Sequence, residues 1–402
     1  RRAQPPARAV SAMRVGVDAT SWVNRRGFGR FARNAVGRLV ETDTDARYLL
    51  YVDAQSADAA DLPARAERRV VSVSRAPSEA AAAGSSRSPL DLLRLTRAVR
   101  RDRPDVFLFP SLYTWFPVVG TPTVVGVHDT IAEENPALTA ASRHERALLR
   151  AKHAWAIRGA ARLFTVSEAS RRAVSARHGL AGASLRVVPE APDPVFGPRP
   201  ESALRAGIAA AGLRPGRRFF VYAGGISPHK NVETLVDAYA LLRSRDGDAP
   251  ALVLVGDLEG EAYLSSAASV RERIARHGLG DDVVLPGFVA DETLACLYAA
   301  ATAVVLPSLA EGFGLPAVEA AACGAAVALS DLPAHRETLD GAALFFDPRD
   351  AGGLADVLAR LAGDEQLGRD LRERARAAAG RLSWDAAAAE LRALIREAAA
   401  LA

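Results

Sequence analysis

The sequence predicts an α/β protein of two domains, each a parallel β-sheet with crossover helices. Short apolar runs alternate with helical patterns along most of the chain, as strands and crossover helices do. The 402 residues exceed what one hydrophobic core usually serves. A proline-rich stretch at residues 188–200 separates two such series and is stiff enough to link two domains. These observations predict two doubly wound domains joined by a linker.

The first series contains seven candidate strands. They lie at Met13–Asp18, Arg47–Asp53, Arg69–Ser74, Val106–Pro110, Thr123–His128, Arg162–Ser167 and Leu185–Pro189. Helical patterns between them include Phe31–Val40 and Ser142–Arg158. We therefore expect residues 13–190 to form an N-terminal domain. Residues 1–12, RRAQPPARAVSA, are expected to be a disordered extension.

The second series contains six candidate strands and ends in helices. The strands lie at Arg218–Ala223, Ala251–Gly256, Asp282–Pro286, Ala303–Pro307, Ala325–Ser330 and Ala343–Phe346. Helical segments fall between them, for example Val232–Arg243 and Leu315–Cys323. Ser383 is placed to cap a last helix that begins near Trp384. We expect a C-terminal domain at residues 191–380 and a separate helix at residues 381–402.

Composition is that of an ordinary globular protein, with 49% hydrophobic and 24% charged residues. No apolar run approaches the roughly 18 to 20 residues of a membrane helix, and the first twelve residues lack the apolar stretch of a signal peptide. The two cysteines, Cys296 and Cys323, give neither a disulfide framework nor metal-ligand spacing. We expect buried thiols, a cytoplasmic location, and neither a metal site nor a cofactor.

Charge is distributed unevenly between the two halves. Residues 1–190 carry 30 basic and 18 acidic side chains, whereas residues 191–402 carry 21 and 29. Either the basic half faces an anionic partner, or its arginines lie on helix faces that are exposed to solvent. Nucleic acid is disfavoured because the basic residues are not interleaved with aromatic ones. The helix predicted at residues 142–158 carries both basic and apolar side chains. Either it lies on anionic lipid headgroups or, as we favour, it packs on the sheet with its basic face in solvent.

The most informative segment is residues 307–324, PSLAEGFGLPAVEAAACG. A hydrophobic strand ends at Pro307, a loop carries Glu311, and Pro316 suits the first turn of a helix. Gly312 and Gly314 let the backbone approach a ligand and aim amide N–H groups at it. A helix N-terminus of this kind binds phosphate.

Glu319 lies about one turn inside this predicted helix, where a carboxylate accepts hydrogen bonds from a ribose diol. Glu311 would reach past the phosphate towards the hydroxyls of a sugar. Phe313 and Leu315 complete the predicted donor-binding loop. Either glutamate alone would be an ordinary polar residue, but with the glycines and the proline the pair predicts a sugar-nucleotide site.

A second segment, residues 218–232 (RFFVYAGGISPHKNV), places a lysine where an α/β sheet binds ligands. A strand ends in Gly224-Gly225 and a helix starts near Asn231, so Lys230 lies at the junction. A cation there would stabilise the charge of a departing diphosphate. His229 either assists or is incidental.

The C-terminal half resembles the retaining glycosyltransferases of the GT-B family 4, the group 1 glycosyltransferases. The resemblance covers residues 217–350 and runs through YAGGISPHKNVETLVDAY, ALVLVGD, VVLPGFVADETLACLYAAATAVVLPSLAEGFGLPAVEAAACGAAVALSDLPAHRE and GAALFFDPRD. It implies that Glu311 contacts the donor sugar, Glu319 the ribose and Lys230 the diphosphate. The backbone around Phe288-Val289 would receive the base.

Two positions depart from the family pattern. Many relatives carry an arginine five residues before the lysine, where this chain has Gly225. Related subfamilies place an arginine immediately before it, where this chain has His229. The sequence does not show which group replaces the missing cation.

The N-terminal half resembles the family more weakly but in order. Gly27-Phe-Gly-Arg30, with Gly27 and Gly29, resembles the glycine-rich loop that faces the donor diphosphate, and it precedes the helix predicted at Phe31. His128 ends a strand, and the family places such a histidine near the donor sugar, although a structural turn is the alternative. Ser167 is expected to cap a helix at the strand-to-helix junction that closes this domain.

The resemblance implies two facing Rossmann-like domains, with the last helix crossing back to the N-terminal one. It implies retaining, metal-independent transfer of a hexose, with mannose or glucose as the expectation. The donor would be a GDP- or UDP-sugar and the acceptor a glycan, glycolipid or small molecule, in cell-envelope or natural-product biosynthesis. The basic N-terminal half favours an anionic or membrane-borne acceptor, with peripheral contact on the inner face of the membrane.

Three other interpretations are weaker. Gly27-x-Gly-x-x-Ala32 with Asp53 resembles a nicotinamide-dinucleotide fingerprint, but eight residues separate the first strand from Gly27. The D-x-D at residues 246–248 follows a helix and is interpreted as a turn rather than a metal site. A non-catalytic binding subunit with the same fold is the third, and the joint presence of Glu311, Glu319, Lys230 and His128 argues against it.

Overall fold

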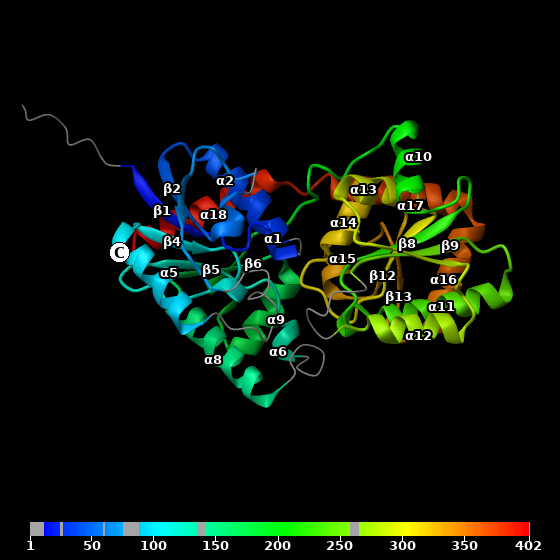
Figure 1. The fold of residues 1–402 in the computed structure, drawn as a ribbon, viewed down its shortest axis with the longest axis horizontal. Coiled ribbons are helices and arrows are strands. Elements are labelled where there is room, and N and C mark those ends of the chain that lie inside the picture. Colours follow the sequence, from blue (N-terminus) through cyan, green and yellow to red (C-terminus); the bar gives the residue numbers. More distant parts are fainter. Residues whose placement is uncertain are drawn as a thin grey trace, which may run out of the picture.

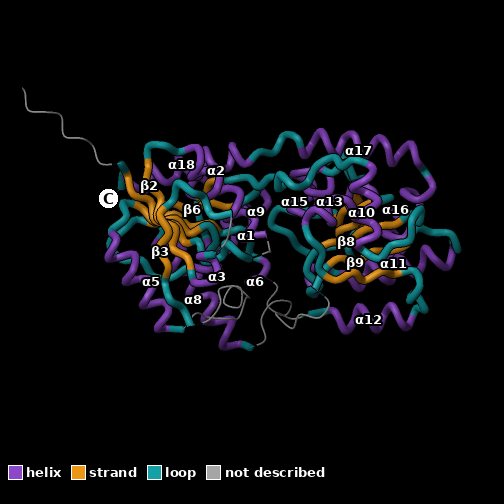
Figure 2. The backbone as a smooth tube through the Cα atoms, turned by 45° about the horizontal axis from the view of Figure 1, so that its top comes forward, coloured by secondary structure: helices purple, strands orange, loops and turns teal. Residues whose placement is uncertain are grey.

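Two parallel β-sheets, one on each side of residues 188–200, form the framework of the molecule (Figure 1). They are seen in a computed structural model that describes residues 12–24, 27–58, 61–74, 88–134, 142–257 and 265–401. The predicted extension lies almost wholly outside the described residues. Helices cover both faces of each sheet, and Figure 2 shows the strands enclosed between them. The predicted α/β fold of two doubly wound domains is confirmed.

The N-terminal sheet has seven strands in the order β3-β2-β1-β4-β5-β6-β7, all parallel. The strands are β1 (Met13–Asp18), β2 (Ala46–Val52), β3 (Glu67–Val70), β4 (Val106–Phe109), β5 (Thr123–Gly126), β6 (Arg162–Thr165) and β7 (Leu185–Val187). Its main described helices are α1 (Gly27–Phe31), α2 (Gly37–Thr42), α3 (Ala54–Ala57), α5 (Pro89–Asp102), α6 (Ile131–Glu134), α8 (Arg143–Gly159) and α9 (Glu168–His178).

The C-terminal sheet has six parallel strands in the order β10-β9-β8-β11-β12-β13. The strands are β8 (Phe219–Ala223), β9 (Ala251–Val255), β10 (Val283–Gly287), β11 (Ala303–Leu306), β12 (Val327–Ser330) and β13 (Leu344–Phe346). The helices are α10 (Glu201–Ala210), α11 (Val232–Arg245), α12 (Ala267–Arg276), α13 (Asp291–Ala300), α14 (Leu315–Ala322), α15 (Pro333–Leu339), α16 (Ala351–Gly363), α17 (Glu365–Ala379) and α18 (Trp384–Ala399).

Strands β8 and β11 lie side by side although they are far apart in the chain. This is the point where the strand order reverses, and ligands of doubly wound sheets bind beyond the carboxyl ends of such strands. Lys230 follows β8 and Glu311 follows β11. The topology therefore brings together the two segments that the sequence singled out.

Helix α18 crosses back to the N-terminal domain, as expected (Figure 1). Ser383 caps it by accepting a hydrogen bond from the N–H of Ala386 at 3.2 Å. The indole of Trp384 donates to the carbonyl of Pro192 at 3.0 Å. At its other end, Glu397 accepts from Arg162 at 2.9 Å and from Arg186 at 2.8 Å.

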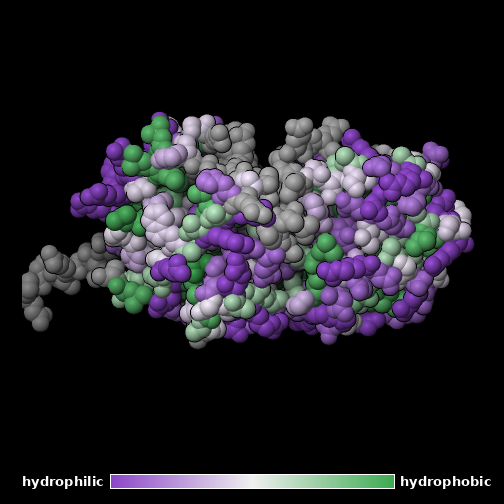
Figure 3. Space-filling view, turned by 90° about the horizontal axis from the view of Figure 1, so that it is seen from below, coloured by the Kyte–Doolittle hydropathy of each residue, from purple (hydrophilic) through white to green (hydrophobic). Residues whose placement is uncertain are grey.

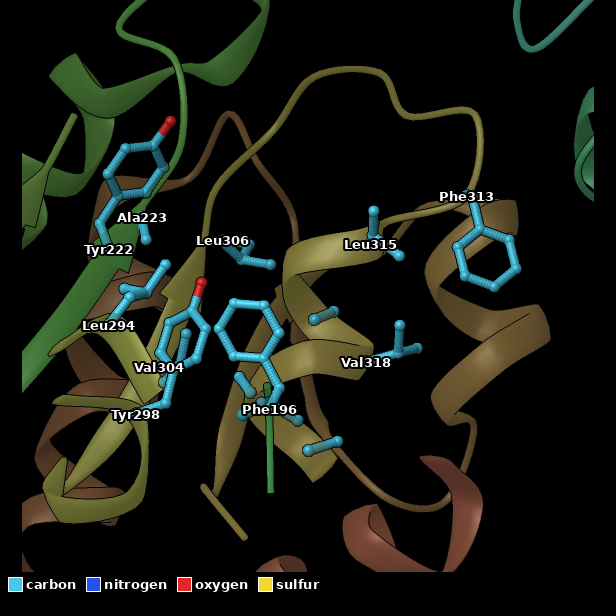
Figure 4. Close-up of a cluster of buried hydrophobic side chains, with 14 of the residues drawn as sticks. Phe196, Tyr222, Ala223, Leu294, Tyr298, Val304, Leu306, Phe313, Leu315 and Val318 are labelled. Carbon is cyan, nitrogen blue, oxygen red and sulfur yellow. The ribbon is translucent and has the colours of Figure 1, made fainter. Parts of the chain in front are cut away.

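A buried cluster lies beneath the loop that carries Glu311 and fixes the position of α14 (Figure 4). Phe196 of the linker packs beside Tyr298 of α13, with their ring centroids 5.9 Å apart. Leu315 and Val318 of α14 are buried as well. Strand residues such as Val304 are fully buried, as expected where helices cover both faces of a parallel sheet.

Two boundaries differ from the prediction by more than the one or two residues seen at other element ends. Strand β3 spans Glu67–Val70 rather than residues 69–74. The first helical segment begins at Gly27 rather than at Phe31, and it continues through a π-helical turn at Ala32–Val36 into α2. The expected glycine-rich loop is therefore the first turn of a helix. Glycine lowers helix propensity, which is why the sequence pattern did not place these residues in the helix.

Candidate active site

Glu311 and Lys230 form an ion pair at the carboxyl ends of β8 and β11. The Lys230 ammonium lies 2.7 Å from Oε1 of Glu311, and the Ser308 hydroxyl donates to the same oxygen at 2.7 Å. Burial alone would raise the pKa of Glu311, but Lys230, His335 and these hydrogen bonds lower it to about 2. Glu311 is therefore an ionised hydrogen-bond acceptor at any physiological pH.

Asn231 holds the two loops of this pair in register. It has a left-handed backbone, with φ of 57°, and its side-chain amide donates to the carbonyls of Pro307 and Pro348 at 2.9 and 2.7 Å. The carbonyl of His229 accepts from the N–H of Leu309 at 2.8 Å. The Glu311 loop and the Lys230 turn thus behave as one unit. Sequence reasoning assigned Asn231 only to a helix start.

Glu319 lies inside α14 and is 2% exposed. One of its carboxylate oxygens lies 3.1 Å from the guanidinium of Arg30, which belongs to the N-terminal domain. Burial raises the pKa of Glu319 to about 8; Arg30 opposes this shift, whereas Asp291 and Asp193 add to it. The two glutamates of the predicted pair therefore have opposite electrostatic environments.

Arg30 is the residue that sequence reasoning missed. Its guanidinium bridges Glu319 and Asp291, at 3.1 and 2.6 Å, and lies over the ring of Phe196 at 5.0 Å. It therefore places a cation from the N-terminal domain beside Glu319, whereas Gly225 supplies none. Its position directly after Gly29 in the quoted glycine motif was the available signal.

His128 is 9% exposed, and its imidazole packs edge-on against the ring of Phe31, with centroids 4.9 Å apart. Nε2 lies 2.8 Å from the carbonyl oxygen of Pro110. Because a carbonyl only accepts, Nε2 carries the hydrogen and Nδ1 carries the lone pair. Burial lowers the pKa of His128 to about 4, so the ring is neutral at physiological pH.

The loop that carries Glu311 touches the N-terminal domain through Gly312. The hydroxyls of Ser167 and Ser170 donate to its carbonyl at 2.6 and 2.8 Å. A Cβ at Gly312 would lie 2.7 Å from the carbonyl oxygen of His128, so only glycine permits this approach. Ser167 also caps α9, as expected, by accepting from the N–H of Ser170.

A second contact between the domains occurs at the N-terminus of α9. The carboxylate of Glu337, on α15, accepts hydrogen bonds from the N–H groups of Glu168 and Ala169, each at 2.8 Å. A carboxylate at a helix N-terminus is favourable because it satisfies free N–H groups and faces the positive end of the dipole. Together with the Gly312 contacts, it holds the two domains against each other.

Gly314 and Gly29 are required by the backbone. Gly314 precedes α14 with φ of 91°, and a Cβ there would lie 2.8 Å from the ring of His335. A Cβ at Gly29 would lie 1.9 Å from the carbonyl oxygen of Asn24. Gly27 has nothing within 4 Å of such a Cβ, and Gly225 is exposed, with its carbonyl accepting from the hydroxyl of Tyr222 at 2.7 Å.

The remaining predicted donor-binding residues divide by exposure. Phe313 and Leu315 are only 5% and 6% exposed, so a contact with a donor would come from their backbone N–H groups. Phe288 is 54% exposed beyond β10, beside Val289, which packs against the core. His229 places Nδ1 3.2 Å from the hydroxyl of Ser227.

Comparison with known proteins assigns the chain to a family. Residues 208–378 match the family model described as glycosyl transferases group 1, and residues 26–195 match glycosyltransferase family 4. The MMP alpha-(1->4)-mannosyltransferase of Mycolicibacterium hassiacum is 32% identical over 295 residues, covering 70% of this chain and 67% of that protein. This chain belongs to the group 1 glycosyltransferases.

Other relatives of this group 1 glycosyltransferase match only in part. The serotype-specific mannosyltransferase WbdA of Escherichia coli is 33% identical over 171 residues, which is 41% of this chain and 20% of that protein. A D-inositol 3-phosphate glycosyltransferase of Jonesia denitrificans is 35% identical over 190 residues, 45% of this chain and 43% of that protein. The match thus spans less than half the length of either relative.

Solved structures share the fold of this glycosyltransferase over nearly its whole length. Sucrose-phosphate synthase from Thermosynechococcus elongatus has a TM-score of 0.75 at 18% identity, covering 97% of this chain and 100% of that one. Anabaena Alr3699/HepE, in complex with UDP and glucose, has a TM-score of 0.72 at 19% identity, covering 95% and 98%. These likenesses support the GT-B fold.

Proposed function

We propose that this protein transfers a hexose, with retention of configuration, from a nucleoside-diphosphate sugar to an acceptor hydroxyl. The observation that carries the proposal is the Lys230–Glu311 ion pair, which lies beside the N-terminus of α14 at the strand-order reversal. A cation, a helix N-terminus and an ionised carboxylate are the groups that a diphosphate and a sugar require.

The donor's diphosphate would bind at Lys230 and the N–H groups that open α14. The ribose would bind Glu319, and the base would lie near Phe288 and Val289. Glu311 is ionised and accepts hydrogen bonds from the sugar hydroxyls. Arg30 is our candidate for the cation that is missing at Gly225, since its guanidinium already lies beside Glu319.

Transfer with retention would follow a front-face route, in which the acceptor hydroxyl approaches on the side that the diphosphate leaves. Glu311 is held in an ion pair by Lys230, which makes it a sugar-positioning group rather than a free nucleophile. The departing diphosphate would receive the acceptor proton. Contacts such as Ser167 with Gly312 support a closed state, which excludes the water that hydrolyses such donors.

We propose mannose or glucose as the sugar and UDP or GDP as the carrier. Mannose is supported because WbdA and the Mycolicibacterium enzyme are mannosyltransferases, and UDP with glucose is supported by the HepE complex. We also propose that leaving-group charge is stabilised by Lys230 and the α14 dipole, without a metal or a cofactor. The rate of transfer is then expected to be unchanged in EDTA.

The acceptor is proposed to be anionic or carried on an anionic membrane surface. On α8, Leu148 and Trp155 are 53% and 60% exposed beside basic residues such as Arg150 and Arg158. In the view from below, hydrophobic and hydrophilic side chains are mixed over the N-terminal half of the surface (Figure 3). None of the described helices has the length and apolarity needed to cross a membrane, so such contact would be peripheral.

A nucleotide screen tests the proposal. The melting temperature of the protein is measured with UDP-, GDP- and dTDP-sugars in turn. Release of the nucleoside diphosphate is then measured with the sugar nucleotide that raises the melting temperature most. We expect one base to raise the melting temperature and its sugar nucleotide to be turned over. Stabilisation without turnover in the presence of any acceptor would favour a binding subunit. No stabilisation by any nucleotide would overturn the proposal.

A further inference from the structure

A carboxyl group that has no part in the proposed mechanism lies at the carboxyl edge of the N-terminal sheet. Glu190 follows β7 in the linker and is 4% exposed. Its Oε1 lies 3.8 Å from Nδ1 of His128, which is too far for a direct hydrogen bond. Within the described residues, no side chain or backbone group makes a hydrogen bond to this carboxyl. A buried polar group without a hydrogen bond is costly unless a ligand completes it.

The two facing groups have complementary hydrogen-bonding character. His128 presents a lone pair at Nδ1, because its Nε2–H is engaged by the Pro110 carbonyl. Burial, and then the charges of Glu319, Glu311 and Asp129, raise the pKa of Glu190 to about 8. At neutral pH Glu190 is therefore a hydrogen-bond donor, and His128 opposite it is an acceptor.

The separation of 3.8 Å suits one bridging hydroxyl between the two groups. We propose that Glu190 and His128 together bind one hydroxyl of the transferred sugar, with Glu190 donating and Nδ1 of His128 accepting. The inference rests on the proposed function and makes Glu190 a determinant of sugar specificity. A site built to hydrogen-bond a hydroxyl rejects analogues that lack it.

The surrounding charges identify the chemical class of the ligand. Glu319, Glu311 and Asp129 are acidic groups that raise the pKa of Glu190, and Glu311 is ionised at neutral pH. The Glu311 carboxylate would repel a phosphate beside Glu190, whereas it would not repel a neutral sugar hydroxyl. The proton on Glu190 also makes it a poor nucleophile, which agrees with a front-face route.

Binding measurements with a sugar nucleotide and with the nucleoside diphosphate alone distinguish the role of Glu190 from that of the nucleotide site. The dissociation constants of UDP-glucose and GDP-mannose are measured beside those of UDP and GDP by titration calorimetry. We expect Glu190→Ala to weaken binding of the sugar nucleotide about tenfold and to leave the affinity for the nucleoside diphosphate unchanged, because only the sugar reaches Glu190. Glu190→Gln retains a donor and an acceptor, so it should bind like the wild type at pH 7.

The matched control is Glu201→Gln, which changes an exposed glutamate that begins α10 and forms a surface ion pair with Arg205. It should leave both dissociation constants unchanged. Circular dichroism and melting temperature show whether each variant is folded. A folded Glu190→Ala variant that keeps the wild-type preference for sugar nucleotide over nucleoside diphosphate would overturn the inference.

The pH dependence supplies a second measurement. We compare the dissociation constant of the sugar nucleotide with that of the nucleoside diphosphate at each pH. Titration of Glu319 should affect both constants equally through the ribose, so it drops out of their ratio. In the wild type, the preference for the sugar nucleotide should be lost as pH rises through about 8, where Glu190 loses its proton. Glu190→Gln should abolish this loss, whereas a flat wild-type ratio between pH 6 and 9 contradicts the role. If the wild type binds neither probe, the proposed function fails, and this inference with it.

Discussion

Glu311 and Glu319 are only eight positions apart in the chain, yet their surroundings shift the pKa of the two carboxyl groups in opposite directions. Glu311 is held by Lys230 and Ser308, both from its own domain, and its pKa falls to about 2. Glu319 is buried and has its cation, Arg30, in the other domain; its pKa rises to about 8. Identical side chains therefore differ in protonation at neutral pH. The charge of Glu311 is built into one domain, whereas that of Glu319 depends on how the domains meet.

Removing Glu311 should produce the largest effect. Glu311→Ala deletes the carboxylate that we propose accepts hydrogen bonds from the donor sugar, and it removes the ion pair of Lys230. We therefore expect transfer to fall at least 10²- to 10³-fold. Binding of the nucleoside diphosphate should remain, because Glu319 and α14 are intact. Turnover and nucleotide affinity measured on the same preparation test this. Unchanged turnover would refute the assigned role, and Ser308→Ala, which removes one hydrogen bond to the same carboxylate, provides a milder comparison.

Domain closure at the same loop is tested at Gly312. Gly312→Ala introduces a Cβ 2.7 Å from the carbonyl oxygen of His128, so the domains must separate slightly. A misplacement of about 1 Å costs up to about 100-fold in rate, and we expect a loss approaching this in kcat. Gly37→Ala, at the start of α2, is the matched control, because nothing lies within 4 Å of its Cβ and alanine favours the helix. Equal kcat values for the two variants would show that close approach at Gly312 is not needed.

The contribution of the other domain to Glu319 is tested at Arg30. In Arg30→Ala the carboxyl keeps its burial and its acidic neighbours but loses the opposing cation, so its pKa should rise further. Arg30 is also our candidate for a cation that binds the diphosphate, and hydrogen bonds to charged groups contribute about 1.5–3 kcal/mol, so we expect nucleoside-diphosphate affinity to fall about tenfold. Arg38→Ala is the control, since Arg38 pairs with Asp385 on the exposed surface. If the two variants bind nucleotide equally well, Arg30 does not contribute to the nucleotide site.

Much of the fold and part of the site followed from sequence. All thirteen strands were placed near their observed positions, because apolar runs record burial on both faces of a parallel sheet. Glu311, Glu319 and Lys230 could be singled out as candidates because glycine and proline mark the loops that carry them. Arg30 and Glu190 were not, because their contacts join residues far apart in the chain. Whether a carboxyl is ionised depends on such neighbours, and spacing along the chain does not encode them.

The smallest effect concerns pH and distinguishes the two glutamates without mutation. Glu311 is ionised throughout the neutral range, so its titration leaves transfer unchanged above about pH 4. Glu319 holds a proton below about pH 8, and an ionised carboxylate accepts both hydrogen bonds of a ribose diol where a protonated one does not. Affinity for the nucleoside diphosphate should therefore rise a few-fold as pH increases through 8. Glu319→Gln should bind more weakly and show no such rise. A rise that persists in this variant would assign the titration to another group and remove the contrast between the two glutamates.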